Sequence, residues 1–380
     1  MLNARFFNAL AMLVGTIIGA GIFGLPYVAA KTGLVPTVIY LTVLTFIVLL
    51  MHLLYGEVVL RTKGKHRLVG YAEIYLGKWG KRVATLSVVL GGYAGLLIYI
   101  ILSGVFLSNL LGEFFGHDPR PYSIIVFFVS FIFIAGGLKV VSWVESFLSF
   151  LLVAAIFLFL AKGSSSISLS SFTESINWSE IFLPYGVLLF ALTGGSIIPD
   201  LISVLEKKEN LIKKTIIIGT LIPAVIYFLF IVIIFGITGE ATTPDAITGL
   251  KNFYGDGFVK IGALVGFLAV ITSFLAFGIN LKKTLQHDYK FSKALSLVLA
   301  LFVPFLIFST GFNDFIRVIG FSGAVMGGID GVLIILMYQK ADREGKGTRK
   351  PEYDIPTSKA LEYLLVVVFA LGIIYAILNP

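Results

Sequence analysis

Apolar runs of about 20 residues recur along this 380-residue chain, and each is long enough to cross a lipid bilayer as an α-helix. Hydrophobic residues make up 58% of the chain and charged residues only 13%, whereas a soluble protein carries about 25% charged residues. Backbone polar groups find no water in a bilayer core, so lipid-exposed segments must satisfy their own hydrogen bonds. The chain is therefore predicted to be an all-α polytopic membrane protein.

Eleven transmembrane helices are predicted, joined by connections rich in Gly, Pro, Asn and charged residues. No small-residue cleavage site follows the first run, so we interpret it as a retained span and not as a signal peptide. A short amphipathic segment, Val69–Leu76, is expected along the membrane surface. We expect one domain, 1–380, with spans near residues 5–30, 35–60, 82–111, 121–138, 141–161, 178–205, 211–238, 257–287, 292–309, 313–338 and 360–378.

The basic residues orient these spans. With the N-terminus inside, all but six of the 29 Lys and Arg residues fall on the inner side, as the positive-inside rule predicts. The C-terminus then lies outside, and the net charge of +8 is explained by contact with anionic inner-leaflet lipid and not by nucleic acid. The predicted location is the cell membrane. The six exceptions are Lys31, Arg120, Lys162, Lys251, Lys260 and Arg317.

The first span contains GTIIGAGIFGLP, Gly15–Pro26, in which Gly19, Gly21 and Gly24 match the G-x-G-x-x-G dinucleotide fingerprint. That fingerprint needs a preceding strand in a soluble βαβ unit, and here an apolar helical run precedes it. Small residues could instead serve close helix packing. The interpretation we favour is a broken helix, because interior glycines each cost about 1 kcal/mol. Unwound backbone must then line a polar cavity, where freed N–H groups attract anions and freed carbonyls attract cations.

A second interruption lies in the sixth span, at FALTGGSIIPD, Phe190–Asp200. Two broken spans in matching positions of two halves are the sequence pattern of inverted-repeat transporters with a binding site at mid-membrane. We therefore expect repeats at about 5–161 and 178–338, followed by an extra helix at about 360–378.

These residues carry a family resemblance. GTIIGAGIFGLPYVAAKTG resembles the first helix of the amino acid/auxin permease group, and of bacterial tyrosine and tryptophan permeases in particular. LAVITSFLAFGINL, Leu268–Leu281, resembles helix 8 of those permeases, and the sixth span with its following loop is also similar. The resemblance implies the five-plus-five inverted-repeat fold of the leucine transporter (LeuT), with discontinuous helices 1 and 6. It also implies amino acid uptake driven by a cation gradient.

The resemblance further implies a substrate site. Backbone N–H groups of Ala20 and Gly21 would hold the substrate carboxylate, and carbonyls of helices 1 and 6 would take its ammonium group. Tyr99, or less favourably Tyr93, would reach the site from helix 3, although either could serve packing alone. Phe190 would be an aromatic gate. The remaining expected contacts are the carbonyls of Ile17, Phe190 and Ala191, the Thr193 hydroxyl, and the wall residues Ser196 and Phe277.

A cation site is expected beside it. In the leucine-transporter fold that the resemblance implies, Ala269, Thr272 and Ser273 would meet the carbonyls of Gly15 and Ile18. Such hard oxygen ligands suit sodium. The two hydroxyls could instead bond to carbonyls one turn earlier. The coupling ion is left open between Na⁺ and H⁺, since Asp200 and Asp330 fall within spans and either carboxyl group could carry a proton.

Other ionisable residues have structural interpretations. Arg5 and Asp288, at inner helix ends, form the inner gate pair that the implied fold suggests. Glu57 and Arg61 are expected to form an ion pair at a helix end. We expect His52, within the second span, to be a hydrogen-bonded core residue.

The absence of certain motifs argues against several classes of membrane protein. No Walker A sequence, H-E-x-x-H motif or nucleophile–base pair occurs, which argues against ATP-driven transport and against an intramembrane enzyme. No cofactor and no metal other than sodium is expected, and the absence of cysteine excludes disulfides. A channel would need a pore lined by carbonyl or charged rings, which is not evident.

We therefore predict a secondary transporter that imports a neutral, aromatic or bulky apolar L-amino acid with a co-transported cation. The alternative is a carrier of the same fold for another solute, such as an amine, or an exchanger. Divalent-metal carriers of this fold have Asp and Asn in the helix 1 break, and this chain has neither there. The sequence indicates a small-molecule partner and a lipid bilayer, but no oligomeric state.

Overall fold

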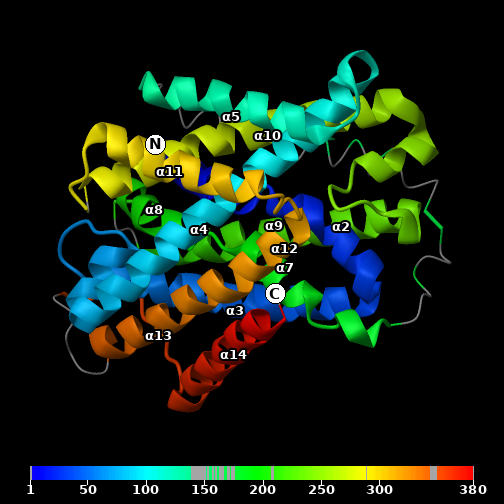
Figure 1. The fold of residues 1–380 in the computed structure, drawn as a ribbon. Coiled ribbons are helices and arrows are strands. Elements are labelled where there is room, and N and C mark those ends of the chain that lie inside the picture. The colour runs from blue at the N-terminus through cyan, green and yellow to red at the C-terminus, as the bar shows by residue number, and fades with distance from the viewer. Residues whose placement is uncertain are drawn as a thin grey trace.

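The computed structural model describes residues 2–137, 176–206, 209–287, 289–342 and 349–379, with isolated residues between 151 and 172. Throughout these described ranges the regular structure is helical and contains no strand (Figure 1). The chain is thus an all-α membrane protein, as predicted.

The helices of the described part follow one another along the chain with short connections. They are α1 (Leu2–Ile17), α2 (Gly21–Thr32), α3 (Leu34–Arg61), α4 (Leu68–Phe115), α5 (Pro119–Ala135), α7 (Leu183–Leu192), α8 (Ile198–Val204), α9 (Glu209–Thr238), α10 (Lys251–His287), α11 (Lys293–Ser309), α12 (Phe315–Ser322), α13 (Gly328–Asp342) and α14 (Lys359–Leu378). Short turns are η3 (Trp178–Glu180), η4 (Gly195–Ile197), η5 (Gly239–Ala241), η6 (Thr248–Leu250) and the π-helical η7 (Gly323–Gly327).

Ten of the eleven predicted spans coincide with these helices, because α1–α2, α7–α8 and α12–η7–α13 each form one span. The fifth span, predicted at 141–161, falls mostly outside the described residues, although residues 151, 154, 155, 158 and 161 are helical. The segment Val69–Leu76 is helical and continues into α4 through a kink at Gly77 (φ 71°, ψ −158°). For this reason α4 begins at Leu68 and not near residue 82.

Two spans are discontinuous at the predicted positions. The helical segments Ala4–Ile17 and Gly21–Thr32 meet at an angle of 49°. Between α7 and η4, Thr193 (φ −72°, ψ 122°) and Gly194 (φ −136°, ψ 15°) leave the helical conformation. Each interruption frees carbonyl groups before the break and N–H groups after it.

Side chains of α3 show how the bundle meets lipid. Val35, Ile39, Val43 and Phe46 are exposed on one face, whereas the C-terminal part of the helix, from Met51 to Leu60, is buried. Figure 1 shows α5 and α14 at opposite edges of the bundle, with α3, α7 and α9 between them. At the two breaks, Ile17, Ile18, Ala20, Ala191, Leu192 and Gly194 are buried, whereas Thr193 and Ser196 are exposed.

Small residues let the central helices approach closely. A Cβ on Gly186 of α7 would collide with the carbonyl oxygen of Gly320 on α12, and one on Gly323 would collide with the carbonyl oxygen of Gly186. Such backbone contacts are the usual means of helix association in membranes, where there is no hydrophobic drive between helices.

Candidate functional site

A cavity of about 210 Å³ lies beside the break between α1 and α2. Its walls come from α1 and α2, from Tyr99 on α4, from Ser196 and Ile197 after the second break, and from α10. Both interrupted spans therefore contribute to one space. We call it the break cavity.

Nine of the residues predicted for substrate and cation line the break cavity. All five predicted cation ligands are among them, although they come from α10 and from the α1 break, more than 250 positions apart. The Thr272 hydroxyl donates to the carbonyls of Leu268 at 3.0 Å and Ala269 at 3.1 Å, so its oxygen lone pairs remain directed elsewhere. The nine are Gly15, Ile18, Ala20, Tyr99, Ser196, Ala269, Thr272, Ser273 and Phe277.

Two aromatic residues form one wall of the break cavity. The rings of Tyr99 and Phe277 meet edge to face with centroids 5.5 Å apart. Tyr93, the alternative to Tyr99, does not line the cavity. A Cβ on Gly95 would lie 3.2 Å from the Phe277 ring, so the absence of a side chain at Gly95 makes room for this aromatic wall.

The N-terminus of α2 is left without a side-chain cap. Its N-cap residue, Ala20, has no side-chain hydrogen bond to offer. The helices α3, α4, α7 and α8 likewise lack a side-chain cap, whereas Asp118, Ser292, Asp314 and Ser358 cap α5, α11, α12 and α14. The Ile22 and Phe23 N–H groups donate to the Gly19 and Ala20 carbonyls at 3.4 and 3.3 Å, so the amides before them, of Ala20 and Gly21, are the ones that an anion at this helix end would meet.

The glycines of the first span divide into two kinds. Around a Cβ placed on Gly19 there is open space. A Cβ on Gly21 would instead lie 2.8 Å from the Ala191 Cα and 2.9 Å from its Cβ, and one on Gly24 would lie 3.2 Å from Ile316. The motif therefore serves both interpretations: Gly19 lies in the break, and Gly21 and Gly24 let α2 pack against α7 and α12.

A tyrosine that was not predicted from the sequence joins the two breaks. The hydroxyl of Tyr227, on α9, lies 2.6 Å from the Ile17 carbonyl oxygen and 2.9 Å from that of Ala191. Tyr227 is fully buried. One hydroxyl proton is thus shared between two carbonyls at the C-terminal ends of α1 and α7, and both carbonyls are among those predicted to receive the substrate ammonium. The Ile17 carbonyl oxygen also accepts the Gly19 N–H at 2.9 Å.

Comparison with known proteins identifies the family. The model of the tryptophan/tyrosine permease family matches residues 3–379, nearly the whole chain. The chain belongs to the tryptophan/tyrosine permease family. It is 26% identical to the tyrosine-specific transport system 1 of Haemophilus influenzae over 351 residues, 87% of each chain. It is 21% identical to glutamine transporter 2 of Aliivibrio fischeri over 338 residues, 86% of each chain.

A solved structure shows the same fold. The crystal structure of MhsT in complex with L-phenylalanine aligns with 97% of each chain, with a TM-score of 0.65 and 15% sequence identity. The permease therefore has the LeuT-like fold with discontinuous helices 1 and 6 that the sequence predicted. As a member of this family it is a secondary amino acid transporter and not an enzyme.

Several predicted residues of the permease lie outside the break cavity. Phe190 is half-buried beside Gly21 and the π-helical η7 segment, and its carbonyl accepts the Thr193 N–H at 3.3 Å. Thr193 faces a second cavity, also of about 210 Å³, on the other side of the α7–η4 break. Ser196 lines both cavities. We call this second space the rear cavity.

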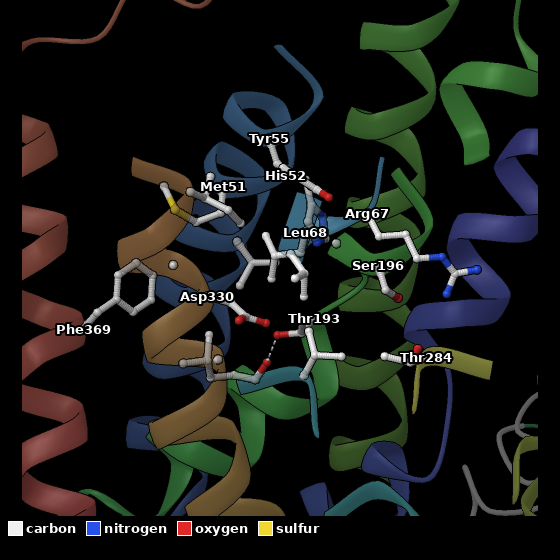
Figure 2. A pocket seen from close by; sticks show the side chains of 18 residues that line it. Met51, His52, Tyr55, Arg67, Leu68, Thr193, Ser196, Thr284, Asp330 and Phe369 are labelled. Atoms are coloured by element: carbon white, nitrogen blue, oxygen red, sulfur yellow. Dashed lines mark hydrogen bonds between the residues drawn. The ribbon is translucent and has the colours of Figure 1, made fainter. Parts of the chain in front are cut away.

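The rear cavity is mostly apolar, with a few polar groups at its walls (Figure 2). Asp330 of α13 lies there, and its Oδ1 accepts a hydrogen bond from Ser87 of α4 at 2.7 Å. The other proton-carrying candidate, Asp200, is exposed in the first turn of α8 and does not line this cavity. Of the two carboxyl groups, only Asp330 is enclosed by the bundle.

An ion pair joins the two broken spans at the end of the bundle where the N-terminus lies. Arg5 of α1 forms an ion pair with Glu206, just after α8, and both side chains are about half exposed. Its predicted partner, Asp288, lies outside the described residues. Arg5 thus connects the α1 end to the α8 end, a pairing not anticipated because Glu206 lies in the loop after the second break.

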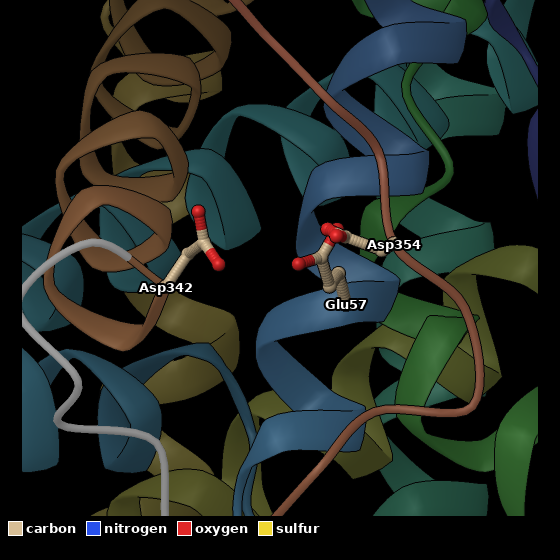
Figure 3. Close-up of side chains that lie close together, drawn as sticks. All are labelled: Glu57, Asp342 and Asp354. Carbon is tan, nitrogen blue, oxygen red and sulfur yellow. The ribbon is translucent and has the colours of Figure 1, made fainter.

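Three carboxylates gather at the C-terminal end of α3, where Glu57, Asp342 and Asp354 have oxygens within 4.8 Å of one another (Figure 3). Arg61 explains this cluster without a metal ion. Its NH2 group lies 2.7 Å from Glu57, 2.6 Å from Asp342 and 3.4 Å from Asp354. The predicted pair of Glu57 and Arg61 is therefore part of a larger network.

This network fastens the segment before α14 to the bundle. The Ile355 N–H donates to Glu57 Oε2 at 2.8 Å, and the Tyr353 hydroxyl donates to the Leu53 carbonyl at 2.7 Å. Tyr353 is buried against Gly56, where a Cβ would collide with its hydroxyl. Burial, followed by the charge of Glu57, raises the pKa of Tyr353 well above 10, so this hydroxyl keeps its proton.

A larger cavity of about 630 Å³ lies at the far end of α2. Charged residues from several elements line it: Lys31, Glu180, Asp245, Asp314 and Arg317. Leu102 and Ile316 form part of its apolar wall. By the predicted orientation this end of the bundle faces outward.

Proposed function

We propose that this permease imports neutral L-amino acids with an aromatic or bulky apolar side chain, and that the break cavity is its substrate site. The observation that supports this most is the gathering of Ala20, Tyr99, Ser196 and Phe277 with all five predicted cation ligands around one cavity. A tyrosine transport system among the relatives and L-phenylalanine bound to MhsT support an aromatic substrate.

The binding mode follows from the two free helix ends. The substrate carboxylate would bind the uncapped N-terminus of α2, at Ala20 and Gly21. Its ammonium group would lie near the carbonyls of Ile17 and Ala191, which Tyr227 holds together. Tyr99 and Phe277 would then receive the side chain. Recognition through backbone groups accepts any α-amino acid, which fits a family that also includes a glutamine transporter.

The coupling ion has two candidate positions. Sodium would bind between the carbonyls of Gly15, Ile18 and Ala269 and the hydroxyls of Thr272 and Ser273. A proton would be carried by Asp330 in the rear cavity. We favour sodium, because its five ligands share the substrate cavity, whereas Asp330 lies beyond the second break.

The uptake experiment that tests this function uses the whole protein in proteoliposomes with radiolabelled tyrosine, tryptophan, phenylalanine, glutamine and leucine. Sodium and pH gradients are imposed separately. We expect concentrative uptake of the aromatic amino acids under an inward sodium gradient. Uptake that depends on neither gradient would mean that the protein is an exchanger or a facilitator and not a cation-coupled transporter. Absence of uptake for every amino acid would overturn the proposal.

The double substitution Thr272→Ala, Ser273→Ala is expected to raise the sodium concentration for half-maximal uptake at least tenfold, because it removes two of five oxygen ligands. The measurement is sodium-dependent uptake at saturating substrate. Thr42→Ala and Ser309→Ala serve as controls, since these exposed hydroxyls only bond to carbonyls of their own helices. Unchanged sodium dependence in the double variant would place the cation elsewhere.

The transport cycle would be a rocking of α1–α3 and α7–α9 against the other helices, which exposes the break cavity to each side in turn. The halves at about 5–161 and 178–338 would act as the inverted repeats, with α14 outside them. We further propose the cell membrane as the location, with the N-terminus in the cytoplasm and the C-terminus outside.

A further inference from the structure

His52 connects three elements at the second break. It lies on α3 and is 2% exposed. Its Nδ1 is 3.0 Å from the Thr220 hydroxyl on α9, and the Gly194 N–H donates to its Nε2 at 3.1 Å. Gly194 is the non-helical residue between α7 and η4, and a Cβ there would lie 2.5 Å from the Ile17 side chain. His52 thus positions the break where α1 and α7 end.

The hydrogen bonds determine which ring nitrogen carries the proton. A backbone N–H can only donate, so Nε2 must accept and cannot carry hydrogen. In a neutral imidazole the proton is then on Nδ1, which donates to the Thr220 hydroxyl. The described geometry is therefore satisfied by one form of His52, the neutral Nδ1–H tautomer.

A protonated ring does not fit this arrangement. Protonation puts a second hydrogen on Nε2, which then faces the Gly194 N–H, so two donors meet. Gly194 would lose its acceptor in a buried position, at the cost of an unsatisfied polar group. Substrate binding that needs this break geometry is therefore weakened when His52 is protonated. By linkage, bound substrate makes protonation of His52 less favourable by the same factor.

The surroundings of His52 have few other ionisable groups. The rear cavity, which His52 lines, carries Tyr55 on the same helix, Arg67 before α4 and Asp330 on α13 (Figure 2). The other residues around His52 and the rear cavity are uncharged where they come from the second break, α9, α10 and α14. They are Thr193, Gly194, Gly195, Ser196, Thr220, Thr284 and Phe369. A proton can thus reach His52 from the rear cavity, which also holds Asp330 and shares only Ser196 with the break cavity.

We propose that His52 is a positioning residue of the substrate site, which holds the Gly194 amide only as its neutral tautomer, and that protonation of His52 from the rear cavity releases the second break. This inference rests on the proposed function of the break cavity. It adds a link between pH and substrate affinity that acts through the helix break.

The first test is equilibrium binding of radiolabelled tyrosine, or of the best substrate in the uptake assay, to purified protein between about pH 8 and pH 4, a range that extends below the ordinary histidine titration. We expect affinity to fall about tenfold toward acid, the effect of one lost buried hydrogen bond. His52→Gln should bind with a pH-independent affinity, whereas Asp330→Asn should retain the acid weakening. If His52→Gln keeps the weaker binding at acid pH and Asp330→Asn loses it, the effect belongs to Asp330 and the proposal is overturned.

The second test needs no transport or binding. Replacing His66, His117 and His287 with glutamine leaves His52 as the single histidine. The ¹⁵N NMR shifts of its labelled ring should show the Nδ1–H tautomer at neutral pH, and an Nε2–H tautomer would overturn the proposal. Thr220→Val removes the acceptor without changing shape and should lower the Nδ1–H population, whereas Thr220→Ser keeps the hydroxyl and should preserve it. If the tautomer is as expected and no amino acid binds, the proposed function fails and the assignment of the ring stands.

Discussion

Replacing Gly21 with alanine is expected to abolish amino acid uptake. The new Cβ would lie 2.8 Å from the Ala191 Cα, and backbone cannot yield as the tip of a flexible side chain can. Overpacking of this kind costs about 1–3 kcal/mol. Here it would also separate α2 from α7 at the point where their free ends meet the proposed substrate. We expect at least a hundredfold loss of uptake, measured in proteoliposomes at equal protein content.

Gly91→Ala provides the matched control for that experiment. Gly91 also lies in a membrane helix, α4, but a Cβ there would meet Met326 at an ordinary 3.7 Å. Since alanine is the better helix former, Gly91→Ala should retain both uptake and thermal stability. Full activity of Gly21→Ala would show that α2 and α7 do not need this close approach and would weaken the proposed site.

Tyr227→Phe is expected to lower kcat/KM for uptake by about tenfold to a hundredfold. The substitution removes the hydroxyl shared by the Ile17 and Ala191 carbonyls. The Ile17 carbonyl still accepts the Gly19 N–H, so the loss falls mainly on the buried Ala191 carbonyl. An unsatisfied buried polar group costs about 1–3 kcal/mol, and 1.4 kcal/mol corresponds to a tenfold change. Initial uptake rates over a range of substrate concentrations measure the effect, together with the midpoint of thermal unfolding.

Tyr185→Phe separates loss of this bridge from loss of a buried hydroxyl in general. The Tyr185 hydroxyl is buried and has no hydrogen-bond partner among the described residues. Its removal should therefore leave uptake unchanged and leave stability unchanged or slightly higher. Equal kinetics for Tyr227→Phe and the unmodified protein would mean that the two carbonyls need no common donor and that the bridge is incidental.

The two breaks illustrate how far sequence reasoning reached. Glycines beside a proline inside a long apolar run predict broken helices, because lipid tolerates unpaired backbone only around a protected cavity. The structure has both interruptions at the predicted residues. The five cation ligands were also predicted together. The family resemblance assigned the hydroxyls of Thr272 and Ser273 to the same site as the carbonyls at the first break. Their binding roles remain predictions.

The sequence placed individual side chains less fully than the breaks. It left Tyr99 and Tyr93 both open, and of the two Tyr99 lines the break cavity. Thr193 faces the rear cavity, because Thr193 and Gly194 both leave the helical conformation there; its contact with substrate remains a prediction. Asn280, one turn beyond Phe277 on α10, lines the break cavity and could have been found from its helical spacing.

The sequence by itself determined that the chain is a membrane protein, which segments form helices and where two of these helices break; its orientation in the membrane remains a prediction from the positive-inside rule. These features depend on local composition and on the length of apolar runs, which any single segment displays. Only the tertiary structure decided that Gly21 touches Ala191, that Tyr227 bridges two carbonyls and that His52 accepts from Gly194. Those contacts join residues up to 210 positions apart, and their geometry depends on how whole helices pack, which no local pattern records.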